Sequence, residues 1–193
     1  MSPRWVVFDY GEVICSRTAA VPELAARLGV PVTDFEPAYW AYRDFYDRGA
    51  ADIDYWRAIG EVVGTTVDES TSDDLTALDI AGWSRIEPSS MALLAGLAEA
   101  GSPLALLSNA PRSFARFAER QPWTRHFRHL LFSGDVGIAK PDAEIFELLT
   151  SRIGAEPGDC LFLDDKQANV DAARAVGLRA QRWVGAPDPA SLR

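Results

Sequence analysis

Short apolar runs of strand length recur along the chain, most of them in its second half. They cover residues 5–8, 104–107, 130–132, 160–163 and 178–183. Most of these runs place apolar residues at both odd and even positions, so both faces of each strand are expected to be buried. This pattern is typical of a parallel sheet that helices cover on both faces.

Helical patterns separate these runs from about residue 88 onward. The expected helices cover residues 89–100, 112–120, 143–153 and 167–176. A glycine follows three of them, at Gly101, Gly154 and Gly177, where a left-handed residue commonly ends a helix. Because strand and helix alternate, we expect an α/β fold with a parallel sheet.

The segment of residues 18–86 interrupts this alternation between the first strand and the rest of the sheet. It is helical in pattern and contains no convincing strand. We therefore expect a core of residues 1–17 and 87–193, and a small helical cap of residues 18–86 over the carboxyl edge of the sheet. The cap aromatics are expected to pack in its interior, with a lid over the site as the alternative: Tyr39, Trp40, Tyr42, Phe45, Tyr46, Tyr55 and Trp56. Four arginines are expected on the solvated surface: Arg43, Arg48, Arg57 and Arg85.

Composition and charge narrow the classes of partner. The 193 residues carry a formal net charge of −9 without a cluster of Lys or Arg, so a nucleic acid partner is not expected. No apolar run approaches the roughly 20 residues of a membrane helix, and the N-terminus does not resemble a signal peptide. Cys15 and Cys160 are expected to be reduced thiols of a cytoplasmic protein. The oligomeric state is open, although exposed cap aromatics could form a homodimer.

Polar side chains stand at or beyond the ends of four expected strands, which is where ligands bind in open α/β sheets. They are Asp9 after the first strand, Ser108 and Asn109 after the second, Lys140 after the third, and Asp164 and Asp165 after the fourth. Taken singly, Asp9 could cap a turn, and Ser108 with Asn109 could begin an ordinary helix. Taken together, they predict one site at one edge of the sheet.

Lys140 and the aspartate pair are harder to explain by structure alone. Lys140 precedes Pro141, which is expected to begin a helix, so its positive charge opposes the helix dipole and needs an anion nearby. Asp164 and Asp165 repel each other and gain from a cation. Carboxylates and an ammonium group at one edge therefore favour each other.

These residue types suit phosphoryl transfer. Asp9 is the candidate nucleophile, which would form an aspartyl-phosphate intermediate, and Lys140 would neutralise charge on the nucleophile and the phosphate. The hard cation Mg²⁺ would bridge Asp9, Asp165 and the phosphate through oxygen ligands.

The remaining candidates would bind phosphate or support the others. Ser108 with Asn109, and the amides that open the following helix, would hold phosphate oxygens. Asp164 would orient Lys140 or a metal-bound water.

Four motifs resemble those of the haloacid dehalogenase (HAD) superfamily. They are "FDYGEV", "LLSNA", "GIAKPDAEIF" and "LFLDDKQANVDAARAVGL", and the match covers roughly residues 5–16 and 88–183. The resemblance implies a Rossmann-like core with an inserted helical cap of the first type (C1). The paired aspartates and Asn169 resemble the branch of sugar-1-phosphate phosphatases and the phosphatase domain of soluble epoxide hydrolases. The resemblance also implies that Asp165, rather than Asp164, binds the metal together with the Gly11 carbonyl. Asp164 and Asn169 are expected to position the ligands without contacting the metal themselves.

One position departs from the family pattern. Phosphatases of this family usually carry an acid/base aspartate two residues after the nucleophile, and this chain has Gly11 there. The first hypothesis is a Mg²⁺-dependent phosphatase of a small phosphorylated metabolite, possibly a sugar phosphate, with an easily departing leaving group or with Glu12 or a cap residue in place of the missing acid.

Two other hypotheses follow from the same departure. A metal-independent 2-haloacid dehalogenase also lacks the second aspartate, but it does not need Asp164 and Asp165 side by side. A binding or regulatory protein on an enzyme scaffold would explain Gly11 as loss of function, but Asp9, Lys140 and Asp165 are all present.

Overall fold

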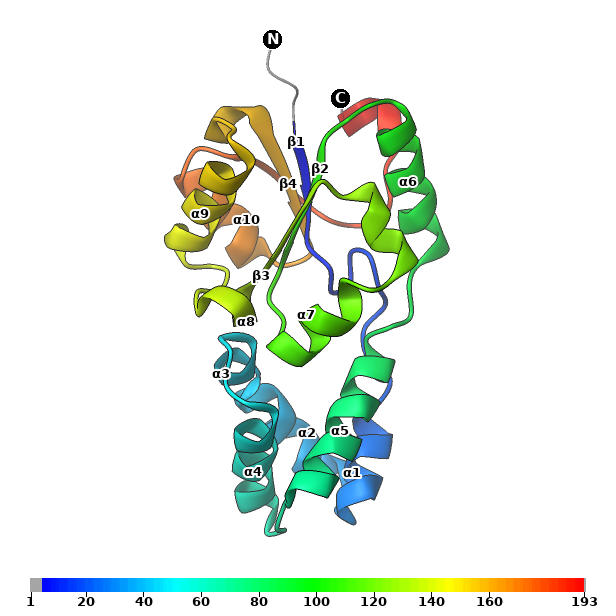
Figure 1. Ribbon diagram of the computed structural model, residues 1–193, viewed down its shortest axis with the longest axis vertical. Helices are drawn as coiled ribbons and strands as arrows, with labels where there is room; N and C mark the ends of the chain where they lie inside the picture. Colours follow the sequence, from blue (N-terminus) through cyan, green and yellow to red (C-terminus); the bar gives the residue numbers. More distant parts are fainter. Residues whose placement is uncertain (1–4, 193) are drawn as a thin grey trace.

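The computed structural model describes residues 5–192 and consists of a sheet-and-helix core above a lobe of helices (Figure 1). Five parallel strands form the sheet in the order β3-β2-β1-β4-β5. The strands are β1 (Trp5–Phe8), β2 (Leu104–Ser108), β3 (His129–Phe132), β4 (Cys160–Asp164) and β5 (Arg179–Arg182). The expected parallel α/β sheet is confirmed.

Helices cover both faces of the sheet. They are α6 (Pro88–Glu99), α7 (Arg112–Ala118), α8 (Ser133–Val136), α9 (Ala143–Ile153) and α10 (Gln167–Ala175), with short 3₁₀ turns η1 (Pro122–His126), η2 (Pro157–Asp159) and η3 (Pro189–Leu192). In Figure 1, α9 and α10 lie on one side of the sheet, and α6 and α7 lie on the other.

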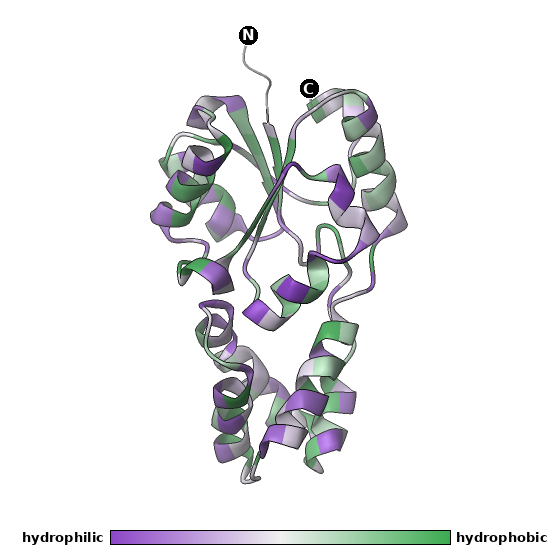
Figure 2. Cartoon of the chain, viewed as in Figure 1, coloured by the Kyte–Doolittle hydropathy of each residue, from purple (hydrophilic) through white to green (hydrophobic). Residues whose placement is uncertain are grey.

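Alternate residues of the strands explain this double cover. Val6 and Phe8 of β1 belong to the apolar cluster under α6 and α7, while Val7 between them belongs to the cluster under α9 and α10. Figure 2 shows the strands as a hydrophobic layer between helices that carry polar residues on their outer faces. The two edge strands depart from the expectation of two buried faces: β3 is only partly buried in its first half, and in β5 Ala180 alone is buried.

Every named element in the segment that was expected to form a cap is a helix. It contains α1 (Val21–Leu28), α2 (Val32–Ala41), α3 (Arg43–Asp47), α4 (Asp52–Val63) and α5 (Glu69–Gly82). These helices form the lower lobe in Figure 1, below the carboxyl ends of the strands. The boundaries 1–17, 18–86 and 87–193 stay a prediction, and residues 1–4 and 193 lie outside the described part.

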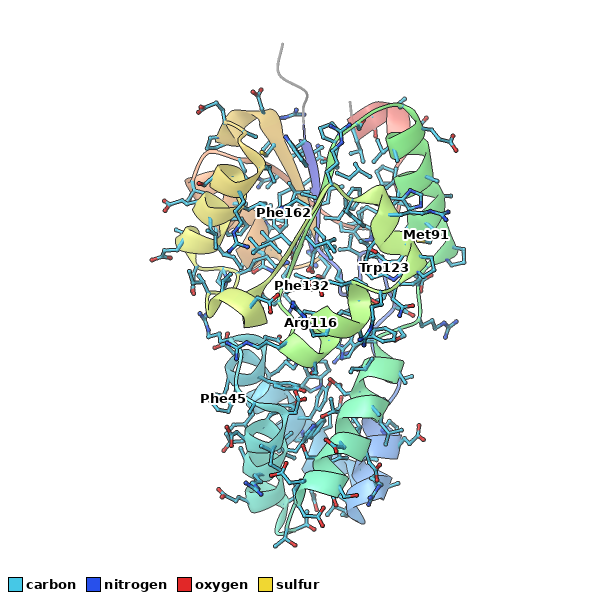
Figure 3. All side chains as sticks on the ribbon, viewed as in Figure 1. Phe45, Met91, Arg116, Trp123, Phe132 and Phe162 are labelled. Atoms are coloured by element: carbon cyan, nitrogen blue, oxygen red, sulfur yellow. The ribbon has the colours of Figure 1, made fainter. Side chains whose placement is uncertain are left out.

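The cap has its own aromatic core. Tyr39, Tyr46, Tyr55 and Trp56 are buried, and the rings of Tyr46 and Tyr55 stack with their centroids 4.1 Å apart. For these four residues the expectation of interior packing is confirmed. Phe45 instead leaves 49% of its surface exposed on the outside of the cap (Figure 3).

Within residues 5–192, none of the helices combines the length and the apolar character needed to cross a membrane.

We predict that Phe162→Ala lowers the free energy of unfolding by about 3–5 kcal/mol, as measured by urea denaturation. Phe162 is fully buried on β4, and its ring lies 5.4 Å from the ring of Phe146, centroid to centroid. The matched control is Val184→Ala, at a residue that is 91% exposed, which should change stability by less than about 0.5 kcal/mol. Equal effects of the two substitutions would contradict this packing.

Candidate active site

The carboxyl edge of the sheet opens into a cavity of about 260 Å³ between the core and the helical lobe. Core residues that line it include Asp9, Gly11, Ser108, Asn109, Lys140, Asp165 and Asn169, and lobe residues include Trp40, Arg43, Asp47 and Trp83. Asp9 directly follows β1, while Ser108 and Asp164 end β2 and β4. The parallel order of these three neighbouring strands brings the predicted residues to one place.

The ammonium group of Lys140 lies at the centre of this site. Its Nζ donates to Asp9 Oδ1 at 2.6 Å, to Asp164 Oδ2 at 2.9 Å and to the carbonyl oxygen of Leu107 at 2.8 Å. All three ammonium protons therefore have acceptors. Burial by itself lowers the pKa of Lys140, but Asp164 and Asp9 outweigh this effect and raise it, so the side chain is a cation.

Asp164 is bonded on all sides and faces the protein interior. It is fully buried, and besides Lys140 it accepts from Asn169 Nδ2 at 3.0 Å and from the backbone N–H of Lys166 at 2.8 Å. These contacts suit the positioning role expected for Asp164 and Asn169, because they leave Asp164 no free direction toward a ligand.

The loop that carries Lys140 is held by Asn109. The side-chain amide of Asn109 accepts from the backbone N–H of Lys140 at 2.9 Å and donates to its carbonyl oxygen at 2.8 Å. Asn109 thus positions Lys140, and its expected contact with phosphate stays a prediction. One detail is corrected: α9 begins at Ala143, so Lys140 precedes the helix by three residues and does not stand at its first turn.

The loop after β2 offers fewer phosphate ligands than expected. Ser108 lines the cavity, in agreement with its place in the sequence. However, the backbone N–H of Ala110 already donates to Ser133 Oγ at 2.9 Å, and Pro111 has no N–H. Helix α7 begins only at Arg112, and the expected contact of phosphate with the amides that open this helix stays a prediction.

The carboxylates form a group that suits a hard cation. One oxygen each of Asp9, Asp164 and Asp165 lies within 4.8 Å of the others. Burial raises the pKa of Asp9 to about 7 although Lys140 lowers it, and burial together with Asp164 raises the pKa of Asp165. The Lys140 ammonium binds two of these carboxylates, Asp9 and Asp164, and Asp164 is also bonded to Asn169 and Lys166. The donor set of Asp9 and Asp165 therefore fits Mg²⁺, which prefers oxygen ligands.

Gly11 is not required by the backbone. A Cβ atom at this position would lie 3.6 Å from Trp83 Cζ3, which is ordinary contact, and Gly11 does not have a positive φ. Its neighbour Glu12 does, at φ 56°, and is exposed. A Cβ atom could therefore be accommodated at position 11, so the fold does not require a glycine there.

The lobe contributes charged residues that the sequence analysis did not expect in the site. Arg43 was expected on the surface, but only 13% of its side chain is exposed; it binds Asp47 Oδ1 at 3.0 Å and Asp79 Oδ2 at 2.9 Å. The spacing of Arg43 and Asp47 by four residues could have revealed this pair. Arg48 is also not free, because it binds Asp142 Oδ2 of the core at 2.6 Å. Arg57 and Arg85 are exposed as expected.

The fold and the site define an α/β protein with a carboxylate–lysine centre at the ends of parallel strands. The chain belongs to the family of haloacid dehalogenase-like hydrolases, whose model matches residues 3–177. The resemblance drawn from the motifs is thereby confirmed.

Two phosphatases are among the proteins to which this chain is similar. Phosphoglycolate phosphatase 1 of Pseudomonas aeruginosa is 27% identical over 188 residues, which cover 92% of this chain and 68% of the relative. Phosphoserine phosphatase of Thermus thermophilus is 36% identical over 101 residues, which cover 50% of this chain and 39% of that protein. The chain thus spans only part of these relatives.

Solved structures confirm the fold. A HAD family enzyme from Bacteroides thetaiotaomicron has a TM-score of 0.79 at 20% identity, covering 100% of this chain and 98% of that one. An L-2-haloacid dehalogenase from Xanthobacter autotrophicus has a TM-score of 0.73 at 18% identity, covering 93% of this chain and 77% of that one. These proteins share the α/β fold that was expected for this chain.

We predict that Asp9 makes stability depend on pH when divalent cations are removed. The Asp9 carboxyl has a pKa of about 7 in the folded protein against 3.8 for the free group, so the folded state binds more protons between these values. Stability of the wild type, relative to Asp9→Asn, should therefore fall as pH rises from about 4 to about 7 and stay level above that range.

The measurement is urea denaturation of both proteins across this pH range in the presence of a chelator. Asp9→Asn is the matched control, because it keeps the shape of the side chain and removes its titration. A stability difference that is the same at every pH would contradict the environment described for Asp9.

Proposed function

We propose that this hydrolase is a Mg²⁺-dependent phosphomonoester hydrolase that acts on a small phosphorylated metabolite, such as a sugar phosphate. The observation that carries the proposal is the position of Asp9, which one buried ammonium holds in the wall of the cavity, near Asp165. A carboxylate fixed in this way is a positioned nucleophile.

Each residue has a part in the reaction. An Asp9 oxygen attacks phosphorus and forms an aspartyl-phosphate as the leaving group departs, and water then attacks the same phosphorus and frees Asp9. Lys140 balances negative charge on Asp9 and on the transferred group, and Ser108 donates a hydrogen bond to a phosphate oxygen. Asp9, Asp165 and the Gly11 carbonyl would hold Mg²⁺, which when bound supplies charge neutralisation of the phosphoryl oxygens.

The relatives support this choice of reaction. Phosphatases of phosphoglycolate and phosphoserine are among the named relatives of the chain. The Bacteroides neighbour has also been solved in complex with magnesium and inorganic phosphate. We further propose that the enzyme works in the cytoplasm without a nucleic acid or membrane partner, which agrees with two buried free cysteines and the net charge of −9.

The two other hypotheses predict different products. A dehalogenase would release halide from a 2-haloacid in the presence of a chelator, and it would not need the carboxylate pair. A binding protein would hold Mg²⁺ or a ligand without turnover. The same assays therefore separate all three hypotheses.

We predict phosphate release from at least one member of a metabolite panel that includes sugar-1-phosphates, with Mg²⁺ present and not with chelator. Asp9→Asn should lower this rate by about 10³-fold or more, since the attacking atom is removed. Asp73→Asn is the control, because Asp73 is exposed on α5 and does not line the cavity.

Phosphate release that persists in Asp9→Asn would refute Asp9 as the nucleophile. Halide release in the presence of chelator, with no phosphate release from any panel member, would replace the proposal with the dehalogenase hypothesis.

A further inference from the structure

The cavity contains two carboxylates that the proposed phosphate and Mg²⁺ chemistry does not use. Its acidic lining residues are Asp9, Asp165, Glu12 and Asp47. Within the described lining there is no histidine, and the hydroxyl of Tyr10 already donates to the carbonyl oxygen of Trp83 at 2.6 Å. Glu12 and Asp47 are therefore the carboxyl groups of this lining that remain as candidates for the proton donor.

Glu12 is not held in one orientation. It is exposed, and among residues 5–192 its side chain makes neither a hydrogen bond nor an ion pair. A general acid must be within hydrogen-bond reach of the leaving oxygen, which an unrestrained side chain at the surface does not ensure.

Asp47 is held at both its backbone and its side chain. Its carbonyl oxygen accepts from Ser133 Oγ at 2.5 Å, and the same Oγ accepts from the backbone N–H of Ala110 at 2.9 Å. Asp47 is thereby tied to the loop that follows Ser108. Figure 1 shows α3, which ends at Asp47, directly below α8 at the carboxyl edge of the sheet.

One oxygen of Asp47 remains available to the cavity. Arg43 Nε donates to Oδ1 at 3.0 Å, whereas Oδ2 has no hydrogen-bond partner in the described part of the chain. Arg43 is also neutralised by Asp79, whose two oxygens accept from Tyr39 and from Arg43. Asp79 therefore balances the charge of Arg43, and one oxygen of Asp47 stays free beside the site.

We propose that Asp47 is the general acid and base of this enzyme, in the role that Gly11 cannot fill; the proposal rests on the proposed phosphatase function. As the bond between phosphorus and the leaving oxygen breaks, that oxygen keeps the electron pair and takes a proton from Asp47. In the second step water attacks phosphorus, the bond to Asp9 breaks, and the proton of the water returns to Asp47.

The electrostatic surroundings of Asp47 agree with this role. Burial raises the pKa of Asp47 to about 6, Arg43 and Lys166 lower it, and Asp79 raises it. A pKa near the working pH suits a group that both donates and accepts protons.

Charged groups on the adjacent elements have partners of their own. Asp52 of α4 accepts from Tyr46, Asp135 of α8 binds Arg116, and Arg112 of α7 donates to the carbonyl oxygen of Gly134.

The test compares two esters of similar shape that differ in leaving group. Phenyl phosphate has the poorer leaving group and depends on an acid, whereas p-nitrophenyl phosphate depends on one much less. For Asp47→Asn we expect kcat/KM with Mg²⁺ to fall by about 10²–10⁴-fold on phenyl phosphate and by less than about 10-fold on p-nitrophenyl phosphate.

Two further variants distinguish catalysis from structural support. Asp44→Asn removes an ion pair of the same helix α3, that with Arg48, without changing the cavity lining, so it should not alter the ratio between the two esters. Adding Gly11→Asp to Asp47→Asn should restore turnover of phenyl phosphate, because a side chain fits beside Trp83.

Equal losses on both esters in Asp47→Asn, or the same selective loss in Asp44→Asn, would overturn the role of Asp47 and leave the phosphatase proposal intact. A wild-type protein that hydrolyses neither ester nor any member of the metabolite panel would overturn the proposed function, and this inference with it.

Discussion

The site depends on one buried cation. Lys140 is 3% exposed, and an ammonium group at such a place is tolerated only when acceptors replace the water that it loses. Three strands supply these acceptors: β1 through Asp9, β2 through the carbonyl of Leu107 and β4 through Asp164. These strands are neighbours in the sheet, so the strand order and the charge balance of the site support each other.

The helical lobe repeats this arrangement with an arginine. Arg43 lies between Asp47 and Asp79 as Lys140 lies between Asp9 and Asp164. In each case one carboxylate is enclosed by protein, and the other lines the cavity. The enclosed carboxylate fixes the cation, and the cation orients the carboxylate that faces the ligand. The two walls of the cavity thus each present one oriented acid.

The core and its site could be predicted from the sequence because their signals are local. Each strand is a short apolar run, and the polar residue at its end is read directly from the chain, as for Asp9 after Val6, Val7 and Phe8. The edge character of β5 was missed, since strand order is not visible in an apolar run. The sequence did not show that the backbone N–H of Ala110, in the loop after β2, is already hydrogen-bonded. Its acceptor is Ser133 Oγ, which lies 23 residues further along the chain.

The lobe side of the cavity could be predicted only in part. The helical character and the aromatic interior follow from composition, but the burial of Arg43 depends on Asp79, which is 36 residues away and on another helix. No local pattern connects these two residues. The absence of an acid at Gly11 is visible in the sequence, whereas its replacement by Asp47 requires the packing of α3 against the core.

The most direct test of the account is the capture of the phosphorylated enzyme. The wild-type protein is mixed with Mg²⁺ and a phosphate ester that it hydrolyses, and the reaction is quenched in acid during turnover. The protein is then digested, and the peptide that contains Asp9 is examined by mass spectrometry. The account predicts a phosphoryl group on Asp9 that borohydride removes by reduction of the acyl phosphate, and its absence in Asp9→Asn. Turnover with unmodified Asp9 throughout, or a phosphoryl group on another residue, would contradict it.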